Sequence, residues 1–138
     1  MKKEKIALTQ EEELQAVIDK AKKKHGKIYK TYLADETILW RKLKRSEYKE
    51  IMDIIVFKQV EKLDENGNPL LDEAGNKIME QVDDLDATYD LRQELIAKAV
   101  ILYPDASIVD DMAACADVIS TECMLKSGFG ESPITEEC

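Results

Sequence analysis

The side chains of this sequence that could perform chemistry are one histidine, three cysteines and several acidic residues. His25 lies in the run KAKKKHG with no second His or Cys nearby, so the sequence suggests neither a nucleophile–His pair nor a metal site around it. Cys115 and Cys123 are eight residues apart in a predicted helix, which separates them by roughly 12 Å and excludes a disulfide. We expect both to pack as reduced thiols, with Cys138 exposed at the chain end.

Acidic residues could pair as carboxylates for acid–base catalysis or hold a divalent metal. They gather in two places, with Asp83, Asp84 and Asp86 in one and Asp110 and Asp111 in the other. Acids at the starts of helices are common because they interact favourably with the helix dipole, so this spacing requires no catalytic role. The glycines lack the spacing of a phosphate-binding loop or a dinucleotide fingerprint. We therefore expect no enzyme activity, no metal and no cofactor.

Residues 63–78 form an internal repeat, in which LDENGNPL is followed directly by LDEAGNKI, and the excursion predicted from it covers residues 64–78. Asp64, Asn66 and Asn68 could offer oxygen ligands to calcium, but the glycine and the bidentate glutamate of an EF-hand loop are missing. Asn and Gly tolerate the backbone conformations of tight turns, so we predict a small β-excursion of turn, short strand and turn. Exposed loops of this kind often contact neighbours, which makes the segment a candidate interface.

Length and composition fit one small domain. The chain has 138 residues, of which 44% are apolar and 36% charged, and its formal net charge is -9. No apolar run approaches the roughly 20 residues that cross a bilayer, and the start of the chain lacks the apolar region of a secretory signal. We expect a location in the cytoplasm and no membrane partner.

Charge is distributed unevenly along the chain. Residues 1–62 contain 16 Lys or Arg and 11 Asp or Glu, a net charge of +5, whereas residues 63–138 contain 4 and 18, a net charge of -14. One interpretation is that the halves fold against each other and their charges offset; the other is head-to-tail contact between copies. Nucleic-acid binding is not favoured, because the chain is a net anion without an extended basic stripe interleaved with aromatic residues.

The hydrophobic pattern predicts an α+β fold, mainly helical, with an N-terminal β-hairpin and a short β-excursion between helices. Residues 1–130 are expected to form one domain and 131–138 a mobile tail. The first predicted helix covers residues 10–25, with a Thr9–Glu12 capping box and a stop at Gly26, and a hairpin over 27–43 with a break at 34–36 follows it. Ser46 is expected to cap a second helix, whose apolar stripe consists of Tyr48, Ile51, Met52, Ile55 and Val56. Two more helices are predicted, one over 85–102 that Pro104 stops and one over about 108–127 that Gly128 ends.

Trp40 has two interpretations within the predicted hairpin. A two-stranded hairpin is marginal in water unless something packs on one face, and core packing is the stronger interpretation for this indole. The alternative is a hairpin edge that is free for strand addition by a partner.

Three segments resemble small tail proteins of bacteriophages. The stretch YLADETILWRKLKRSEYKEI is similar to a family pattern of a hairpin that ends in an aromatic residue, followed by R-x-L-x-R-x-E-[YF]-x-x-[IL] at the start of a helix. VILYPD and LKSGFG resemble two later segments of that family, in the same order. The residues that fill the first pattern are Arg41, Leu43, Arg45, Glu47, Tyr48 and Ile51. The repeat at 63–78 is not part of the pattern and looks like an insertion.

The resemblance implies a tail or baseplate component, or a tail assembly chaperone, that acts by binding other tail proteins and copies of itself. It implies a place in the host cytoplasm during assembly and, for a structural component, in the tail of the virion. We take the hairpin and the excursion as partner surfaces, and we expect Phe129, after the last predicted helix, to dock on the domain. The candidate partner-binding residues are Tyr32, Trp40, Arg41, Arg45, Asn66, Asn76 and Phe129.

Two other classes of function remain open. The acidic second half could mimic nucleic acid and inhibit a host DNA-binding protein through Asp83, Asp84, Asp110 and Asp111. The same carboxylates could serve an enzyme that uses a divalent metal.

Overall fold

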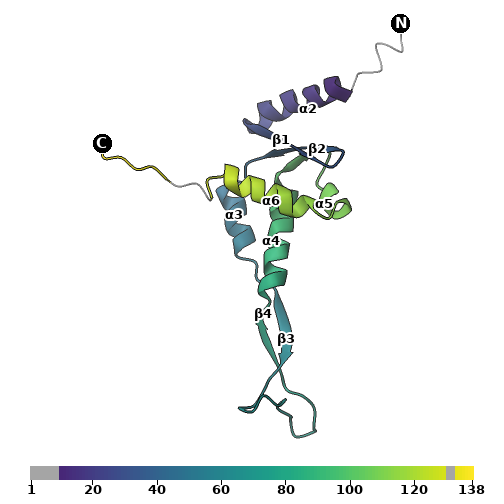
Figure 1. Cartoon of the computed structure of the whole chain (residues 1–138), viewed down its shortest axis with the longest axis vertical. Coiled ribbons are helices and arrows are strands. Elements are labelled where there is room, and N and C mark those ends of the chain that lie inside the picture. Colours follow the sequence, from purple (N-terminus) through teal and green to yellow (C-terminus); the bar gives the residue numbers. More distant parts are fainter. Residues whose placement is uncertain (1–9, 130–132) are drawn as a thin grey trace.

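The computed structural model describes residues 10–129 and 133–138, which form the predicted α+β fold with five helices and five strands (Figure 1). Thr9, with its predicted cap, and the predicted domain end at residue 130 lie outside these residues. No helix in the described ranges is long and apolar enough to span a membrane. The elements are α2 (Gln10–His25), β1 (Ile28–Leu33), β2 (Glu36–Arg41), α3 (Arg45–Met52), β3 (Phe57–Glu61), β4 (Met79–Asp83), α4 (Leu85–Val100), β5 (Ile101–Tyr103), α5 (Ile108–Asp111) and α6 (Cys115–Lys126).

The first helix and the hairpin confirm their predictions. α2 covers the predicted residues and stops before Gly26, whose φ is +79°. β1 pairs antiparallel with β2, and Leu33 lies opposite Glu36, so Ala34 and Asp35 form a two-residue turn. Such a turn needs positive φ, and Ala34 has a φ of +52°.

A third strand completes the sheet, which the sequence did not predict. The helix expected over 85–102 ends at Val100, and β5 pairs antiparallel with β2 to give the strand order β1-β2-β5. The assignment of Leu102 to the helix is therefore wrong. Ile101 lies opposite Trp40 and Tyr103 opposite Leu39, so pairing with a distant strand overrides the local helical pattern.

One face of the sheet builds the main core, together with α3, α4, α5 and α6. Ile38 and Trp40 of β2 point into this core and are 0% and 2% exposed. The Trp40 indole stacks on Tyr29 with 4.7 Å between ring centroids, and its Nε1 donates a hydrogen bond of 2.9 Å to the Thr31 hydroxyl. The structure thus bears out core packing for Trp40.

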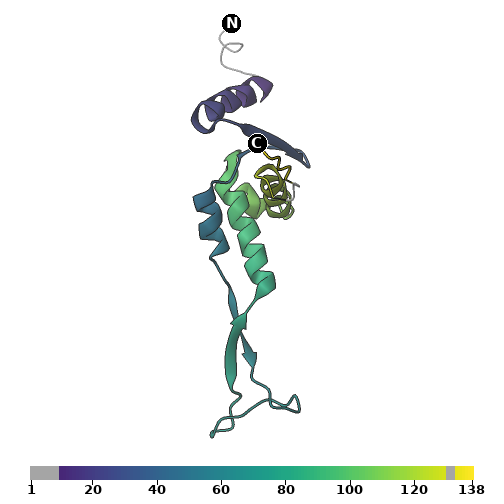
Figure 2. The ribbon, with the colours of Figure 1, turned by 90° about the vertical axis from the view of Figure 1, so that its left-hand side faces the viewer.

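The opposite face of the sheet lies under α2, which the second view shows as a separate layer above the hairpin (Figure 2). Side chains alternate along a strand, so Leu39 points away from the core that Ile38 and Trp40 enter. Leu39 is nonetheless fully buried, and Ala21 of α2 is 9% exposed. Helices therefore cover both faces of the hairpin, whereas β1 remains an edge strand.

α3 is shorter than predicted. Its N-cap is Lys44 rather than Ser46, and the Glu47 carboxylate accepts a 2.9 Å hydrogen bond from the Lys44 backbone N–H. Ile51 of the predicted apolar stripe is buried, but the helix ends at Met52 and Ile55 is 48% exposed, so the prediction that the helical stripe continues to Ile55 and Val56 is wrong.

The last predicted helix is broken into α5 and α6. Met112 has an extended backbone with φ of -127°, which interrupts the helical pattern expected over about 108–127. The break lets Ile108 of α5 and Cys115 of α6 enter the same core. Gly128 ends α6 as predicted, with a φ of +100°.

The predicted excursion is longer than expected because two strands extend it. β3 and β4 pair antiparallel, with Phe57 opposite Asp83 and Glu61 opposite Met79. We call residues 57–83 the arm. Figures 1 and 2 both show it projecting from the helices, at the end of the molecule opposite α2.

Candidate partner-binding surfaces

The tip of the arm contains the sequence repeat as two turns of the same geometry. The Asp64 carboxylate accepts hydrogen bonds from the backbone N–H groups of Asn66 and Asn68, at 2.8 and 3.0 Å. Asp72 does the same for Ala74 and Asn76, at 2.9 Å each. Gly67 and Gly75 take φ of +83° and +85°, a conformation that an L-residue adopts only with strain. The predicted pair of turns is confirmed, and the two Asp carboxylates stabilise the backbone of these turns.

The arm exposes apolar side chains along its whole length. Its exposed large apolar residues are Phe57 (51%), Leu63 (53%), Leu71 (57%), Ile78 (37%) and Met79 (48%). The candidate residues Asn66 and Asn76 are also exposed, at the tip. β3 and β4 make their main contacts with each other. A solitary two-stranded ribbon is marginally stable in water, and an exposed apolar surface of this kind is typical of a contact site.

Arg92 and Thr88 of α4 fix the base of the arm, and the sequence pattern indicated neither role. The Arg92 guanidinium donates hydrogen bonds to the carbonyls of Met52, at 2.7 Å, and Ile54, at 2.9 and 3.2 Å. The Thr88 hydroxyl accepts a 2.8 Å hydrogen bond from the Val56 N–H. Arg92 thus holds the backbone carbonyls at the end of α3, and Thr88 holds the backbone N–H just before β3 begins. The one feature of the sequence that could have indicated the role of Thr88 is its polar side chain on the otherwise apolar inner face of the helix, because a buried hydroxyl needs a hydrogen-bond partner.

Arg41 links three elements instead of facing solvent. Its guanidinium forms a bidentate pair with Glu47 of α3, at 2.7 and 2.8 Å, and donates a 2.8 Å hydrogen bond to the Ala99 carbonyl of α4. The two side chains are 13% and 25% exposed. The hydrogen bond from Arg41 lowers the pKa of Glu47, with a further contribution from the Lys44 N–H, against the opposing effect of burial. Arg41 and Glu47 of the first motif therefore hold β2, α3 and α4 together.

Phe129 docks on the domain, as predicted, at the end of α6. The N–H groups of Gly128 and Phe129 donate to the carbonyls of Leu125 and Met124, at 3.2 and 3.0 Å, and these bonds close the last turn of the helix. The Phe129 ring stacks on Tyr48 of α3 with 4.9 Å between centroids. The ring stays 41% exposed, and exposed Arg45 lines the same small cavity of about 160 Å³. The structure thus brings Arg45 and Phe129 together.

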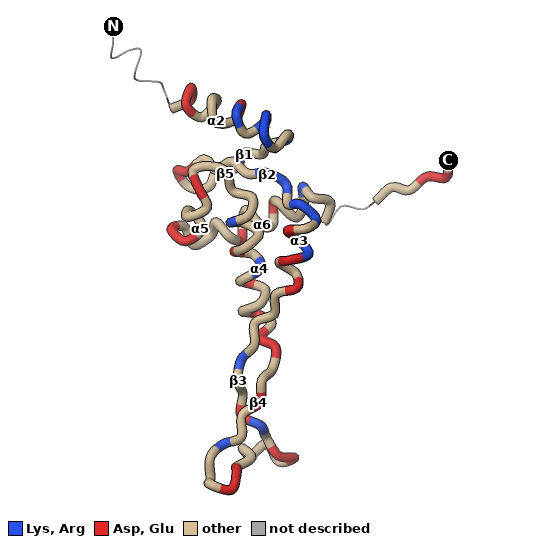
Figure 3. The backbone as a smooth tube through the Cα atoms, turned by 180° about the vertical axis from the view of Figure 1, so that it is seen from behind, with Lys and Arg blue, Asp and Glu red and all other residues tan. Residues whose placement is uncertain are grey.

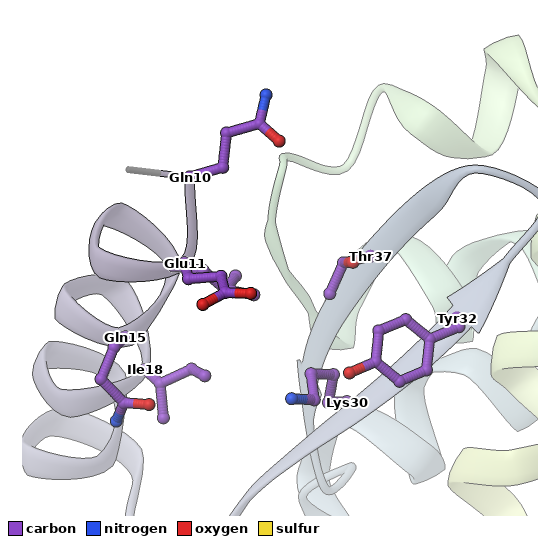
Figure 4. Close-up of a pocket in the computed structure, with 8 residues that line it drawn as sticks. Gln10, Glu11, Gln15, Ile18, Lys30, Tyr32 and Thr37 are labelled. Atoms are coloured by element: carbon purple, nitrogen blue, oxygen red, sulfur yellow. The ribbon is translucent and has the colours of Figure 1, made fainter. Parts of the chain in front are cut away.

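Tyr32 lies on a separate groove between α2 and the hairpin. In Figure 4, side chains of α2, including Glu11 and Ile18, face Lys30, Tyr32 and Thr37 of the hairpin across a gap. The groove has a volume of about 400 Å³, and Leu14 contributes to its lining. Tyr32 is 68% exposed, with the Lys30 ammonium 5.4 Å from the centre of its ring. We call this hollow the α2 groove.

Basic residues gather near the end of α2 and the connection between β2 and α3 (Figure 3), and one exposed cation, Lys30, also lines the α2 groove. Burial lowers the pKa of His25, and the nearby charges of Arg41, Lys24 and Lys44 lower it further. Another proton is unfavourable there because cations crowd the site. The basic cluster consists of the exposed residues Lys20, Lys22, Lys23, Lys24, Lys27, Lys30, Lys42, Lys44 and Arg45.

The acidic residues considered for catalysis serve structure or lie apart. The Asp84 carboxylate caps α4 by accepting a 3.1 Å hydrogen bond from the Ala87 N–H, and Asp110 pairs with Lys98 at 3.1 Å. In the described parts of the chain, no three His, Cys, Asp or Glu side chains are grouped as a metal would need. Burial raises the pKa of the Cys115 and Cys123 thiols, so both stay protonated, as expected for packed cysteines.

The predicted site residues therefore belong to different surfaces. Trp40 and Arg41 are structural, Arg45 and Phe129 share one hollow, Tyr32 lines the α2 groove, and Asn66 and Asn76 lie on the arm tip. Comparison with known proteins adds no relative, since no family model, curated protein or solved structure gives a significant match.

Proposed function

We propose that this chain is a non-enzymatic structural or assembly protein of a bacteriophage tail or baseplate, and that it acts through contacts with other tail proteins. The observation that carries the proposal is the arm, which extends from the domain and exposes apolar side chains such as Phe57, Leu63 and Leu71. Burial of these side chains against a partner would stabilise the complex by about 25 cal/mol for each Å² of apolar surface removed from water. The resemblance of three segments to small tail proteins supplies the class of partner.

The proposed work takes place in the host cytoplasm during tail assembly. A structural component remains in the finished tail, whereas an assembly chaperone leaves before completion. In both cases the arm is the primary contact, because its main intramolecular contacts are between its own strands. The body of the protein then serves as the base that orients the arm, through Arg92 and Thr88.

The test combines mass spectrometry of purified virions from the source phage with a pull-down that uses the full chain as bait. A second bait replaces residues 63–77 by Asn-Gly, a two-residue turn that joins the neighbouring positions Lys62 and Ile78. We expect the intact bait to capture a tail protein and the shortened bait to lose it. Absence from virions and from tail intermediates, with no tail protein captured, would contradict the proposal. Capture of a host DNA-binding protein instead would favour the acidic inhibitor.

A further inference from the structure

The arm and the basic cluster are oppositely charged surfaces of one chain. The arm contains three Lys and seven Asp or Glu, a net charge of -4. Its acidic side chains at Glu65, Glu73 and Glu80 are exposed. The basic cluster has nine exposed cations, and in the described residues none of them takes part in an ion pair. Each surface therefore keeps an excess of one charge.

In the described residues, one ion pair joins the two halves of the chain, between Lys77 and Glu61. The ion pairs of the described residues are Arg41–Glu47, Lys77–Glu61, Lys98–Glu94 and Lys98–Asp110. None of these joins a cation of residues 1–62 to an acid of residues 63–138. The described ion pairs therefore leave the cations of the basic cluster without an acidic partner from the second half of the chain.

The two surfaces cannot meet within one molecule. α2 and the basic cluster lie at one end of the long axis, and the arm tip lies at the other, with the core helices between them (Figures 1 and 3). Charges this far apart are screened from each other at physiological ionic strength, where the Debye length is about 8 Å. Complementary surfaces at opposite ends can come into contact only between molecules.

The surface beside the basic cluster also has apolar and backbone groups that suit the arm. Leu14, Ile18 and Tyr32 line the α2 groove, and Lys30 belongs both to this groove and to the basic cluster. Among the residues that the structure describes, β1 pairs on one side only, and its other edge has backbone donors and acceptors without a strand partner. The exposed leucines of the arm tip and its acids therefore have counterparts side by side.

We propose that the arm of one copy binds the basic cluster and the α2 groove of a second copy. The contact is heterologous, because it joins two different surfaces, and each bound copy still presents a free arm or a free cluster. Repetition gives a ring or an open chain of protomers. A second copy of the chain is then one partner in the assembly role proposed above. The contact itself does not depend on that role, but its biological purpose rests on it.

Charge exchange between the two surfaces tests the contact. The arm variant carries Glu65→Lys and Glu73→Lys, which leaves the turn-capping Asp64 and Asp72 in place. The cluster variant carries Lys30→Glu and Lys42→Glu, both at exposed positions. The arm variant removes the net charge of the arm, from -4 to 0, and the cluster variant lowers the charge of the basic cluster from +9 to +5, so we expect the self-association of each variant alone to weaken roughly tenfold or more. An equimolar mixture brings the unaltered arm of the cluster variant to the unaltered basic cluster of the arm variant and should restore association of the two, which also demonstrates that both variants fold.

Sedimentation velocity over a wide range of protein concentration provides the measurement. We expect the unaltered chain to associate at about 0.1 M salt and to dissociate at about 1 M, where the Debye length falls to about 3 Å. The control variant Glu136→Lys with Glu137→Lys changes the same number of charges in the exposed C-terminal segment and should associate normally.

Two results would overturn the inference. One is a chain that stays monomeric at all concentrations at low salt, and the other is association of the arm or cluster variant as strong as that of the unaltered chain. Neither result contradicts the tail function if the bait still captures a tail protein. Conversely, self-association without a tail protein in the pull-down would leave this contact intact and remove the proposed function.

Discussion

The Arg41–Glu47 pair makes stability depend on pH through one carboxylate. The pKa of Glu47 is lowered in the folded protein, so its contribution is present above the unfolded value of about 4.3 and is lost as pH falls through the lower folded pKa. We expect Glu47→Gln to reduce the free energy of unfolding at pH 7 by about 1–2 kcal/mol, because the charged hydrogen bonds become neutral. Urea unfolding at pH 7 and pH 3 measures the loss, which should shrink at the lower pH.

The matched control is Glu50→Gln, which changes an exposed carboxylate on the same helix. We expect it to alter stability by less than about 0.5 kcal/mol at either pH. An equal loss for Glu47→Gln at both pH values would contradict an ionic origin and would indicate a purely steric one.

Gly128 has a conformational role that a side chain would disturb. Its φ is +100°, and a Cβ built there meets no atom within 4 Å, so a substitution is strained by the backbone and not by crowding. We expect Gly128→Ala to cost about 1–2 kcal/mol of unfolding free energy. Gly128→Asn should cost less, because Asn visits left-handed conformations more readily. Equal stability of the Ala and Asn variants in urea would contradict this explanation.

At the scale of elements, the sequence predicts correctly those helix ends and turns that depend on neighbouring residues. The run of cations and Gly26 mark the end of α2, and alternation around a polar turn marks the hairpin. The end of α3 and the strand β5 depend on distant groups: Arg92 binds the Met52 carbonyl, and β2 pairs with Ile101. No short window of sequence contains both partners of these contacts, so periodicity extended each helix too far.

The arm, which is the main candidate contact site, could likewise be predicted only where local residues determine its structure. The repeated Asp, Asn and Gly residues identify the two turns of the arm tip from their types and spacing alone. The strands that carry the tip away from the body have no clear pattern, because most side chains of FKQVE and MEQVD are exposed to solvent. The sequence therefore predicts only a short excursion, and its full length and direction come from pairing between β3 and β4.

The attachment of the arm gives a prediction for α4. Arg92→Met keeps the aliphatic stem but removes the hydrogen bonds to the Met52 and Ile54 carbonyls. We expect amide hydrogen exchange over residues 53–61 to accelerate by roughly tenfold, which corresponds to about 1.4 kcal/mol of local opening. Arg45→Met, at an exposed arginine, is the control and should leave this exchange unchanged. Unaltered exchange in the Arg92 variant would show that β3–β4 pairing alone fixes the arm.

At the scale of the whole molecule, the arm and the body are structurally separate parts. The core of the body comes from β2, α3, α4, α5, α6 and β5, with no described residue of the arm among its buried members. The basic cluster lies on the body and the arm has a net charge of -4, while the rest of the chain, which also contains the acids of residues 84–138, has a net charge of -5. The sequence reveals the asymmetry of charge along the chain, and the fold places the basic cluster and the arm tip toward opposite ends of the molecule, with further acids on the body (Figure 3).

This division predicts that the arm tip is dispensable for folding. Replacing residues 63–77 by Asn-Gly removes the exposed Leu63 and Leu71 and leaves every buried core residue in place. We expect the free energy of unfolding of the body to change by less than about 0.5 kcal/mol, as for other exposed positions. Thermal and urea unfolding of the two chains, compared below the concentration at which either associates, provide the measurement. A large loss of stability would mean that the tip supports the body, and loss of partner capture by this variant would then no longer identify the arm as the contact.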